Sequence, residues 1–219
     1  MLTVLVTGAN RGIGLELCRQ LSERGDQVIA VCRNTSSELD DLHVAVISGI
    51  DVRDDSSVKS LAKKLNGRRI DILINNAGIL QSDRLDELNF ENMKSQFEVN
   101  ALGPLRVTTA LLDNFKRGSK IIIITSRMGS ITDNSSGAYY GYRMSKAAVN
   151  MAGMTLSRDL YDKNIAVGIL HPGMVATQMT GGQGISPTES ARGLIARIEA
   201  LDIKKSGSFW HAQGEELPW

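Results

Sequence analysis

Residues 2–15 read Leu-Thr-Val-Leu-Val-Thr-Gly-Ala-Asn-Arg-Gly-Ile-Gly-Leu. The first six form a continuous apolar, β-branched run, which is typical of a strand buried on both faces. Glycines follow at positions 8, 12 and 14, and a helical pattern then runs over residues 14–24 and stops at Gly25. A glycine-rich turn between a strand and a helix lets backbone N–H groups approach a phosphate at the positive end of the helix dipole. This context predicts a dinucleotide-binding turn made of Gly8, Asn10, Arg11, Gly12, Ile13 and Gly14.

Strand and helix patterns alternate along the rest of the chain. Such alternation predicts right-handed crossovers and a parallel sheet with helices on both faces. We therefore expect an α/β, doubly wound fold with a seven-stranded sheet, in one domain that spans residues 1–219. The four isoleucines of strand 120–125 suggest that it is the most central, and Gly103-Pro104 should bend the long helix 90–115. The predicted strands are 2–7, 27–32, 44–47, 70–74, 120–125, 165–170 and 207–210, and the predicted helices are 14–24, 54–65, 90–115, 142–160 and 188–201.

Composition narrows the class of protein. The chain has 25 basic and 24 acidic residues, a formal net charge of +1, which is too small for an electrostatic grip on nucleic acid or anionic lipid. No apolar run approaches the roughly 18 residues that span a bilayer, and a strand pattern from residue 2 leaves no room for a signal peptide. Cys18 and Cys32 lack the spacing of a metal site or a disulfide scaffold. We expect a cytoplasmic protein with no metal, no nucleic-acid partner and no membrane partner.

Two more motifs point to a family. Asn75-Asn76-Ala77-Gly78 follows the fourth predicted strand, and Tyr142-Arg143-Met144-Ser145-Lys146 opens a later helix. With the Gly-x-x-x-Gly-x-Gly spacing of residues 8–14, they resemble the short-chain dehydrogenase/reductase family over essentially the whole chain. His171-Pro172-Gly173 and Leu217-Pro218-Trp219 resemble, more weakly, its carbonyl-reductase-like branch that includes the sniffer and C-factor proteins. The resemblance implies a Rossmann fold and hydride transfer between a nicotinamide dinucleotide and a carbonyl or alcohol.

The residue after the second strand predicts which dinucleotide is bound. Enzymes that use NAD usually place a carboxylate there, which binds the 2′-hydroxyl of the ribose. This chain has Arg33 at that place, and Arg11 of the glycine turn is within reach of it. Two guanidinium groups favour a 2′-phosphate, so NADP(H) is the predicted cofactor. The alternative is that Arg33 is only a solvated charge at a strand end.

The resemblance assigns the remaining cofactor contacts. It implies that the Asp51 side chain meets the adenine amine, that Asn75 braces the sheet, and that the Val175 backbone and the Thr177 hydroxyl hold the carboxamide. The implied contacts are Asp51 and Val52 at the adenine, Asn76, Ala77 and Gly78 at the adenosine ribose, Tyr142 and Lys146, and Pro172, Gly173, Val175 and Thr177 on the nicotinamide side.

Tyr142 and Lys146 are the predicted catalytic pair. Residues four apart on a helix share a face, and neither Tyr139 nor Tyr140 has a lysine at that spacing. A phenol with a pKa near 10 is a poor acid at neutral pH. An ammonium about 4 Å away would lower that pKa by roughly three units. We therefore expect Lys146 to bring the pKa of Tyr142 towards neutrality.

The resemblance adds two polar residues to the catalytic set. Ser126 ends an expected strand, where a parallel sheet places ligand groups, and would steady the substrate oxygen. It lies 16 residues before Tyr142, against a usual spacing of about 13, so we expect an insertion around residues 132–140; Ser130, 12 residues before Tyr142, is the alternative. Asn100 would organise a proton-relay water through Lys146.

In many members of the family that the chain resembles, 25 or more residues after the nicotinamide side fold over the substrate, whereas this chain has only Gln178–Pro187 there. This segment has ten residues, of which three are glycine, and Thr188 is expected to cap the helix that follows. Such a segment is too short and flexible to build a packed cover. We therefore expect a site that is open to water and accepts several aldehydes or ketones, or a larger partner molecule that supplies its own cover.

The leading interpretation is an NADP-dependent carbonyl reductase or dehydrogenase that acts on a small molecule. The alternative is a C-factor-like signalling or regulatory protein that binds the cofactor and has incidental activity. A sugar-nucleotide epimerase is disfavoured by the short chain and the glycine spacing. The resemblance also implies a homodimer or homotetramer formed through helices 90–115 and 142–160, although monomers exist in this branch.

Overall fold

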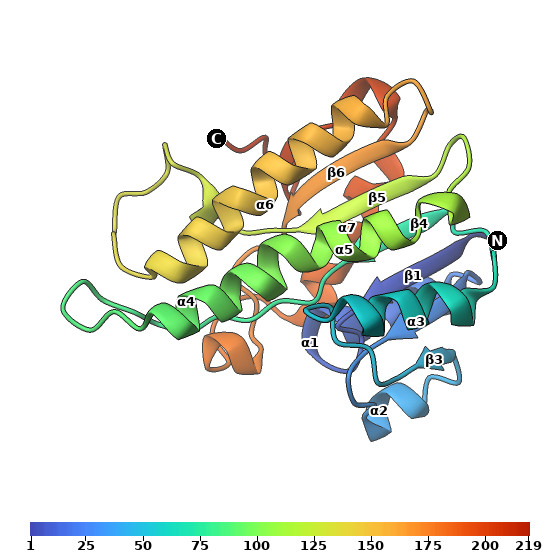
Figure 1. Cartoon of the computed structure of the whole chain (residues 1–219), viewed down its shortest axis with the longest axis horizontal. Helices are drawn as coiled ribbons and strands as arrows, with labels where there is room; N and C mark the ends of the chain where they lie inside the picture. Colours follow the sequence, from blue (N-terminus) through green and yellow to red (C-terminus); the bar gives the residue numbers. More distant parts are fainter.

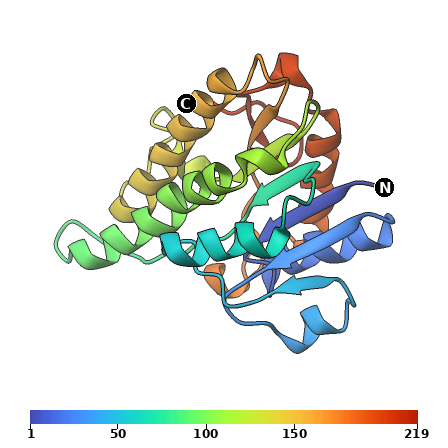
Figure 2. The ribbon, with the colours of Figure 1, turned by 45° about the vertical axis from the view of Figure 1, so that its right-hand side comes forward.

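The computed structural model describes residues 1–219 and contains one sheet with helices on both faces (Figures 1 and 2). Its strand order is β3-β2-β1-β4-β5-β6-β7, and every neighbouring pair is parallel. This confirms the predicted doubly wound α/β fold. The strands are β1 (Thr3–Thr7), β2 (Gln27–Val31), β3 (Ala45–Ile47), β4 (Ile72–Asn75), β5 (Lys120–Ile124), β6 (Ala166–His171) and β7 (Phe209–His211).

The helices divide between the two faces of the sheet. Side chains of α1 and α7 pack with Val4 and Val6 on one face, while those of α3, α5 and α6 pack with Leu5 on the other. Because successive residues of β1 serve opposite cores, its sequence is apolar throughout. The helices are α1 (Gly12–Glu23), α2 (Ser37–Asp40), α3 (Asp55–Leu65), α4 (Phe90–Phe97), α5 (Gly103–Ala110), α6 (Tyr140–Asp159) and α7 (Pro187–Ala200).

Three details differ from the predictions. The central strand of the seven is β4, with β5 next to it. The helix expected over 90–115 is interrupted by a π-helical turn, η1 (Glu98–Leu102), just before Gly103-Pro104, and its last turn is the 3₁₀ segment η2 (Leu112–Asn114). The helix α7 is capped by Ser186, whose hydroxyl accepts the N–H of Glu189, because Pro187 takes the first helical position. The other 3₁₀ segments are η3 (Arg127–Gly129), η4 (Gln178–Thr180) and η5 (Ile203–Lys205).

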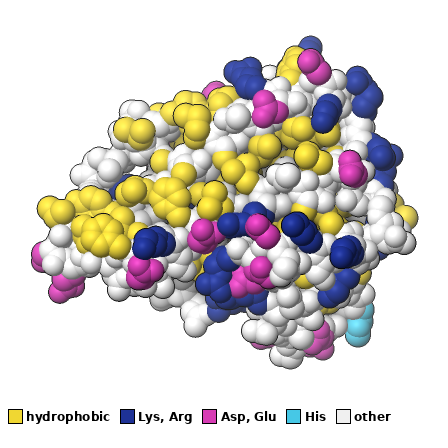
Figure 3. All heavy atoms as spheres, in the orientation of Figure 1, with side chains coloured by type: hydrophobic (Ala, Val, Ile, Leu, Met, Phe, Trp, Pro, Cys, Tyr) yellow, Lys and Arg dark blue, Asp and Glu magenta, His cyan; other side chains and the backbone are white.

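The strand order reverses between β1 and β4, and ligands of open α/β sheets bind at the carboxyl ends of the strands at such a point. None of the helices has the length and apolar character that crossing a membrane requires. Hydrophobic side chains gather on the face that carries α4 and α6 (Figure 3). The exposed apolar residues of these two helices include Phe90, Met144 and Met151.

Candidate active site

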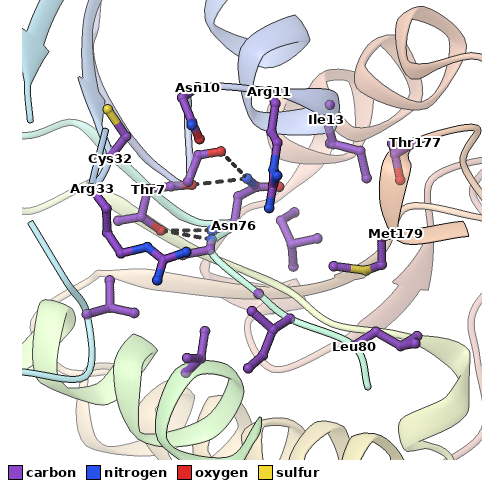
Figure 4. A pocket seen from close by; sticks show the side chains of 18 of the residues that line it. Thr7, Asn10, Arg11, Ile13, Cys32, Arg33, Asn76, Leu80, Thr177 and Met179 are labelled. Atoms are coloured by element: carbon purple, nitrogen blue, oxygen red, sulfur yellow. Dashed lines mark hydrogen bonds between the residues drawn. The ribbon is translucent and has the colours of Figure 1, made fainter. Parts of the chain in front are cut away.

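A cavity of about 890 Å³ lies at the carboxyl ends of the strands, where the order reverses (Figure 4). It brings together segments that follow β1, β2, β3, β4 and β6 with the first turns of α6. The predicted site residues that line it are Gly8, Asn10, Arg11, Gly12, Ile13, Arg33, Asp51, Val52, Asn76, Ala77, Gly78, Tyr142, Lys146, Pro172 and Thr177. The predicted residues outside its lining are Gly14, Asn100, Ser126, Gly173 and Val175.

The glycine turn fits tightly against the Asn-Asn-Ala-Gly motif. Gly8 has a φ of 67°, and a Cβ added there would lie 2.8 Å from the Cα of Ala77. The side-chain amide of Asn76 donates to the carbonyl oxygens of Thr7 (3.0 Å) and Gly8 (3.2 Å), as Figure 4 shows. A Cβ on Gly14 would lie 2.2 Å from the Gly8 carbonyl oxygen, so Gly14 supports the turn from beneath instead of lining the cavity. The motif therefore fixes the shape of a backbone cradle.

One end of the cavity, which we call the outer end, is formed by Arg33, Asp51 and Arg53. The Arg53 guanidinium makes a close ion pair with Asp51, with 2.7 Å between Nη2 and Oδ2. Its hydrogen bonds and charge lower the pKa of Asp51, and Arg33 adds to the effect. The outer end therefore carries two guanidinium groups and one carboxylate. Arg53 was not predicted as a site residue, although its place two positions after Asp51 could have suggested it.

Arg11 lies further along the cavity. Its guanidinium donates to the Oε1 atom of Gln178 at 2.7 Å, a contact between residues 167 positions apart. Figure 4 shows Arg11 and Arg33 both directed into the cavity. The contact between Arg11 and Gln178 joins the glycine turn to the segment after β6.

The opposite end, which we call the inner end, holds Tyr142 and Lys146. Both are buried, at 7% and 5% exposure, and the Lys146 ammonium donates to the Ile124 carbonyl at 3.0 Å. Burial raises the pKa of Tyr142 to about 12 and lowers the pKa of Lys146 to about 8. The expectation that the ammonium brings the pKa of the phenol towards neutrality is wrong, because desolvation by burial is the largest cause of the shift and raises this pKa. The Lys146 Nζ atom lies 5.7 Å from the centre of the phenol ring.

Ser126 lies close enough to Tyr142 for its hydroxyl to lower the pKa of the phenol, which partly opposes the rise caused by burial. The Ser126 hydroxyl also accepts the N–H of Met128 at 3.1 Å, which starts η3. Ser130 instead caps a turn, since its hydroxyl accepts the N–H of Asp133. Residues 131–137, which follow, are exposed and lie within the stretch where the insertion is expected. Of the two serines, the structure brings Ser126 to the phenol.

Asn100 lies in the π-helical turn η1, beneath the inner end. Its amide oxygen accepts the N–H of Ile79 and its amide nitrogen donates to the Ile79 carbonyl, both at 2.9 Å, and to Ser145 Oγ at 3.0 Å. A Cβ on Gly78 would lie 3.4 Å from the Asn100 Oδ1 atom and 3.8 Å from Lys146 Nζ, so these groups are neighbours. Asn75 bonds Thr108 of α5 at 3.3 Å, as its bracing role predicts.

The segment after β6 is folded back on itself by hydrogen bonds and contains no long helix. The N–H of Ala176 bonds the carbonyl of Ile185, and the N–H of Ile185 bonds that of Met174, both at 2.8 Å. The Thr180 hydroxyl donates to the Val175 carbonyl at 2.6 Å. These bonds fold residues 174–185 into a compact bend whose only helical piece is η4. Met179 and Leu80 line the cavity, and Leu80 was not predicted as a site residue.

Gly173 and Val175 lie beside the cavity and are not part of its lining. Gly173, with a φ of 89°, faces Ile185 and the ring of His211, and Val175 is buried at 3% exposure. Both therefore shape the bend without lining the cavity. The structure contains no cluster of three or more His, Cys, Asp or Glu side chains that could hold a metal ion.

Comparisons with known proteins agree with this geometry. The model of the short chain dehydrogenase family matches residues 2–186. The 1-hydroxy-2-glutathionyl-2-methyl-3-butene dehydrogenase of Rhodococcus sp. strain AD45 is 41% identical, with 100% of each chain covered. The C-signal protein of Myxococcus xanthus is 43% identical over 68% of this chain and 93% of its own.

Among solved structures, the NADPH-bound carbonyl reductase from chicken fatty liver superposes with a TM-score of 0.90 and 31% identity, covering 99% of this chain and 98% of its own. These similarities confirm the predicted resemblance, including its carbonyl-reductase-like and C-factor-like branch. The chain belongs to the short-chain dehydrogenase/reductase family of oxidoreductases.

Proposed function

We propose that residues 1–219 form one catalytic domain, an NADP(H)-dependent oxidoreductase that interconverts a carbonyl compound and its alcohol. The observation that carries this proposal is the single cavity that joins two guanidinium groups at its outer end to Tyr142 and Lys146 at its inner end. Arg33 and Arg53 suit a 2′-phosphate, whereas the only carboxylate there, Asp51, is already paired with Arg53.

The residues of the cavity fit a dinucleotide. Gly8 and Gly12 both have positive φ, and their missing side chains leave backbone exposed beside the first turn of α1, where phosphates are favoured. Arg11 adds a positive charge to this middle part of the cavity. Asp51 and Val52 would contact the adenine, and Asn76, Ala77 and Gly78 would line its ribose. Pro172 and Thr177, supported by Gly173 and Val175, would lie on the nicotinamide side.

Bound NADP(H) would supply or accept the hydride. The Ser126 hydroxyl would hold the substrate oxygen next to the Tyr142 phenol. In the reductive direction Tyr142 would donate its phenolic proton to that oxygen, and burial keeps this proton in place at neutral pH. The Lys146 ammonium would stabilise the phenolate that remains. Asn100 would hold the Ile79 backbone and a water that passes protons to Lys146.

A panel of substrates tests the proposal. NADPH oxidation is measured with aldehydes and ketones, and NADP reduction with alcohols, including a primary alcohol that carries a glutathionyl group. We include the last compound because of the 41% identity to a dehydrogenase of that class across the whole chain. Turnover with at least one pair supports an enzyme. Tight NADPH binding without turnover on the whole panel would favour the second candidate, a cofactor-binding signalling protein, which the similarity to C-signal supports.

We also infer that copies of the chain would associate through α4 and α6. Phe90 of α4 and Met144 and Met151 of α6 expose large apolar side chains.

A further inference from the structure

The helix that carries Tyr142 and Lys146 begins without a cap of its own. The first N–H groups of a helix need acceptors, which the preceding side chain usually supplies. Tyr139, which precedes α6, has a left-handed φ of 54° and offers no side-chain cap. Tyr142 is the third residue of this helix, so its position depends on how the first turn is fixed.

Asp83 supplies the missing acceptors from a distant part of the chain. One of its carboxylate oxygens accepts the N–H of Tyr140, and the other accepts the N–H of Gly141 at 3.0 Å. Its backbone carbonyl accepts the N–H of Tyr139 at 2.9 Å. Asp83 is 5% exposed, so these bonds are shielded from water, and its negative charge lies at the positive end of the helix dipole. Three successive amides are thus held by one residue.

Asp83 is the last residue of the segment 79–83, and side chains of α4 and η1 hold this segment in place. The Asn100 side chain binds both backbone groups of Ile79, and the Gln96 side chain accepts the N–H of Gln81 at 3.0 Å. Leu80, between these two attachments, lines the cavity. The wall of the cavity and the start of α6 are therefore parts of one hydrogen-bonded unit.

Gly141 fixes the same turn from the side. A Cβ added there would lie 2.6 Å from Gln96 Nε2 and 3.0 Å from the Cα atom of Met93. The first turn of α6 therefore lies directly against α4, with no room to move closer. The close packing limits sideways movement, and the two bonds to Asp83 limit rotation and movement along the helix axis.

We propose that Asp83 is a positioning residue, which holds the first turn of α6 so that the Tyr142 phenol stays beside Ser126. The proposal rests on the proposed role of Tyr142 as the proton donor. Displacement of a catalytic group by about 1 Å can cost about 100-fold in rate. Asp83 reaches the phenol only through the backbone of α6, and the amides that it binds come directly before Tyr142 in the chain.

The test substitutes Asp83→Asn, which keeps the shape of the side chain but turns one acceptor into an NH₂ group facing an N–H. At most one of the two side-chain bonds survives. We expect kcat for the best substrate of the panel to fall about tenfold, while the Kd for NADPH stays within twofold of wild type. Hydrogen exchange of the peptide that spans residues 138–146 should become faster at the same time.

Asp54→Asn is the matched control. Asp54 accepts the N–H groups of Ser56 (3.1 Å) and Ser57 (3.0 Å) at the start of α3, so it makes the same pair of bonds. It lies outside the lining of the cavity. This variant should lose stability by a similar mechanism and leave kcat unchanged.

Three outcomes would overturn the proposal. In the first, Asp83→Asn keeps the kcat of wild type. In the second, NADPH binding falls as much as kcat, which indicates general damage. In the third, exchange of peptide 138–146 is unchanged. A separate measurement recognises the case in which Tyr142 is not the proton donor, because the Tyr142→Phe variant would then keep the kcat of wild type. In that case exchange of the peptide decides whether Asp83 holds the turn.

Discussion

The outer and inner ends of the cavity use charged groups in different ways. At the outer end, the side chains of Arg53 and Asp51 are 43% and 28% exposed, and the charges are paired and partly hydrated. At the inner end, Tyr142 and Lys146 are almost fully buried, and burial shifts the pKa of each towards its neutral form. An exposed ion pair contributes about 0–1 kcal/mol to stability, whereas a buried unpaired charge costs much more. Substitutions at the outer end should therefore change selectivity alone, and those at the inner end should change chemistry and stability together.

The largest effect is expected for Tyr142→Phe, at the inner end. Loss of a general acid typically costs 10²–10⁴-fold in rate, so we expect kcat to fall about 1000-fold. The ring remains, so NADPH should bind with unchanged affinity, measured by intrinsic fluorescence. Tyr140→Phe is the matched control, because Tyr140 is 36% exposed and lies outside the cavity lining. If Tyr142→Phe kept a tenth of the wild-type rate, the proton would have to come from another residue.

The second effect concerns the outer end and the choice of cofactor. Each charge-assisted hydrogen bond contributes about 1.5–3 kcal/mol, so NADPH should bind at least tenfold more tightly than NADH. Arg33→Asp should reverse this preference and leave the melting temperature unchanged, because Arg33 is exposed. Arg117→Asp makes the same change in charge on an exposed residue outside the cavity lining and should leave both affinities as they are. Equal affinity of the wild type for NADPH and NADH would contradict the role of Arg33.

The sequence predicts which residues line the cavity better than it predicts their pKa values, for a physical reason. The glycine turn, Arg33 and Asp51 follow strands directly, and in a parallel sheet the carboxyl ends of strands meet at one edge. Their place therefore follows from the strand pattern. The direction of the pKa shift at Tyr142 depends on burial, which the spacing of Tyr142 and Lys146 does not contain. The spacing predicts only that a lysine lies near the phenol, and from this alone we expected the pKa of Tyr142 to fall, whereas it rises.

The strand and helix pattern of the sequence also does not predict contacts between segments that are far apart in the chain. Asp83 caps a helix that begins 57 residues later. The sequence around Asp83 does not indicate which helix it caps, and the sequence around Tyr140 does not indicate where the cap comes from. The π-helical turn at Asn100 lies inside a pattern that reads as continuous helix, because periodicity does not register one extra residue per turn. The cap of α7 could have been predicted from the sequence. Proline favours the first position of a helix, so Pro187 indicates that the residue before it, Ser186, is the cap.

The smallest effect is expected for Lys146→Met, which should raise the free energy of unfolding. This variant tests whether the inner end, unlike the outer end, is destabilised by a charge. The pKa of Lys146 falls from 10.5 to about 8, because the buried ammonium lacks the hydration it has in the unfolded chain. Below pH 8 the lysine is charged in both states, so the folded protein carries the full desolvation penalty. Lys146→Met removes the charge and keeps most of the volume, at the loss of one hydrogen bond to Ile124. We expect the free energy of unfolding at pH 7 to rise by about 1–2 kcal/mol while turnover is lost.

The dependence on pH separates this explanation from better packing of methionine. Between pH 8 and pH 10.5 the folded wild type gives up the Lys146 proton while the unfolded chain keeps it, so wild-type stability gains from rising pH. The advantage of Lys146→Met, measured by urea unfolding, should therefore shrink between pH 7 and pH 10. Lys163→Met removes an exposed charge and should show no such trend. If Lys146→Met were more stable than wild type by the same amount at every pH, the charge of Lys146 would not be what destabilises the protein. The inner end would then tolerate a charge as the outer end does.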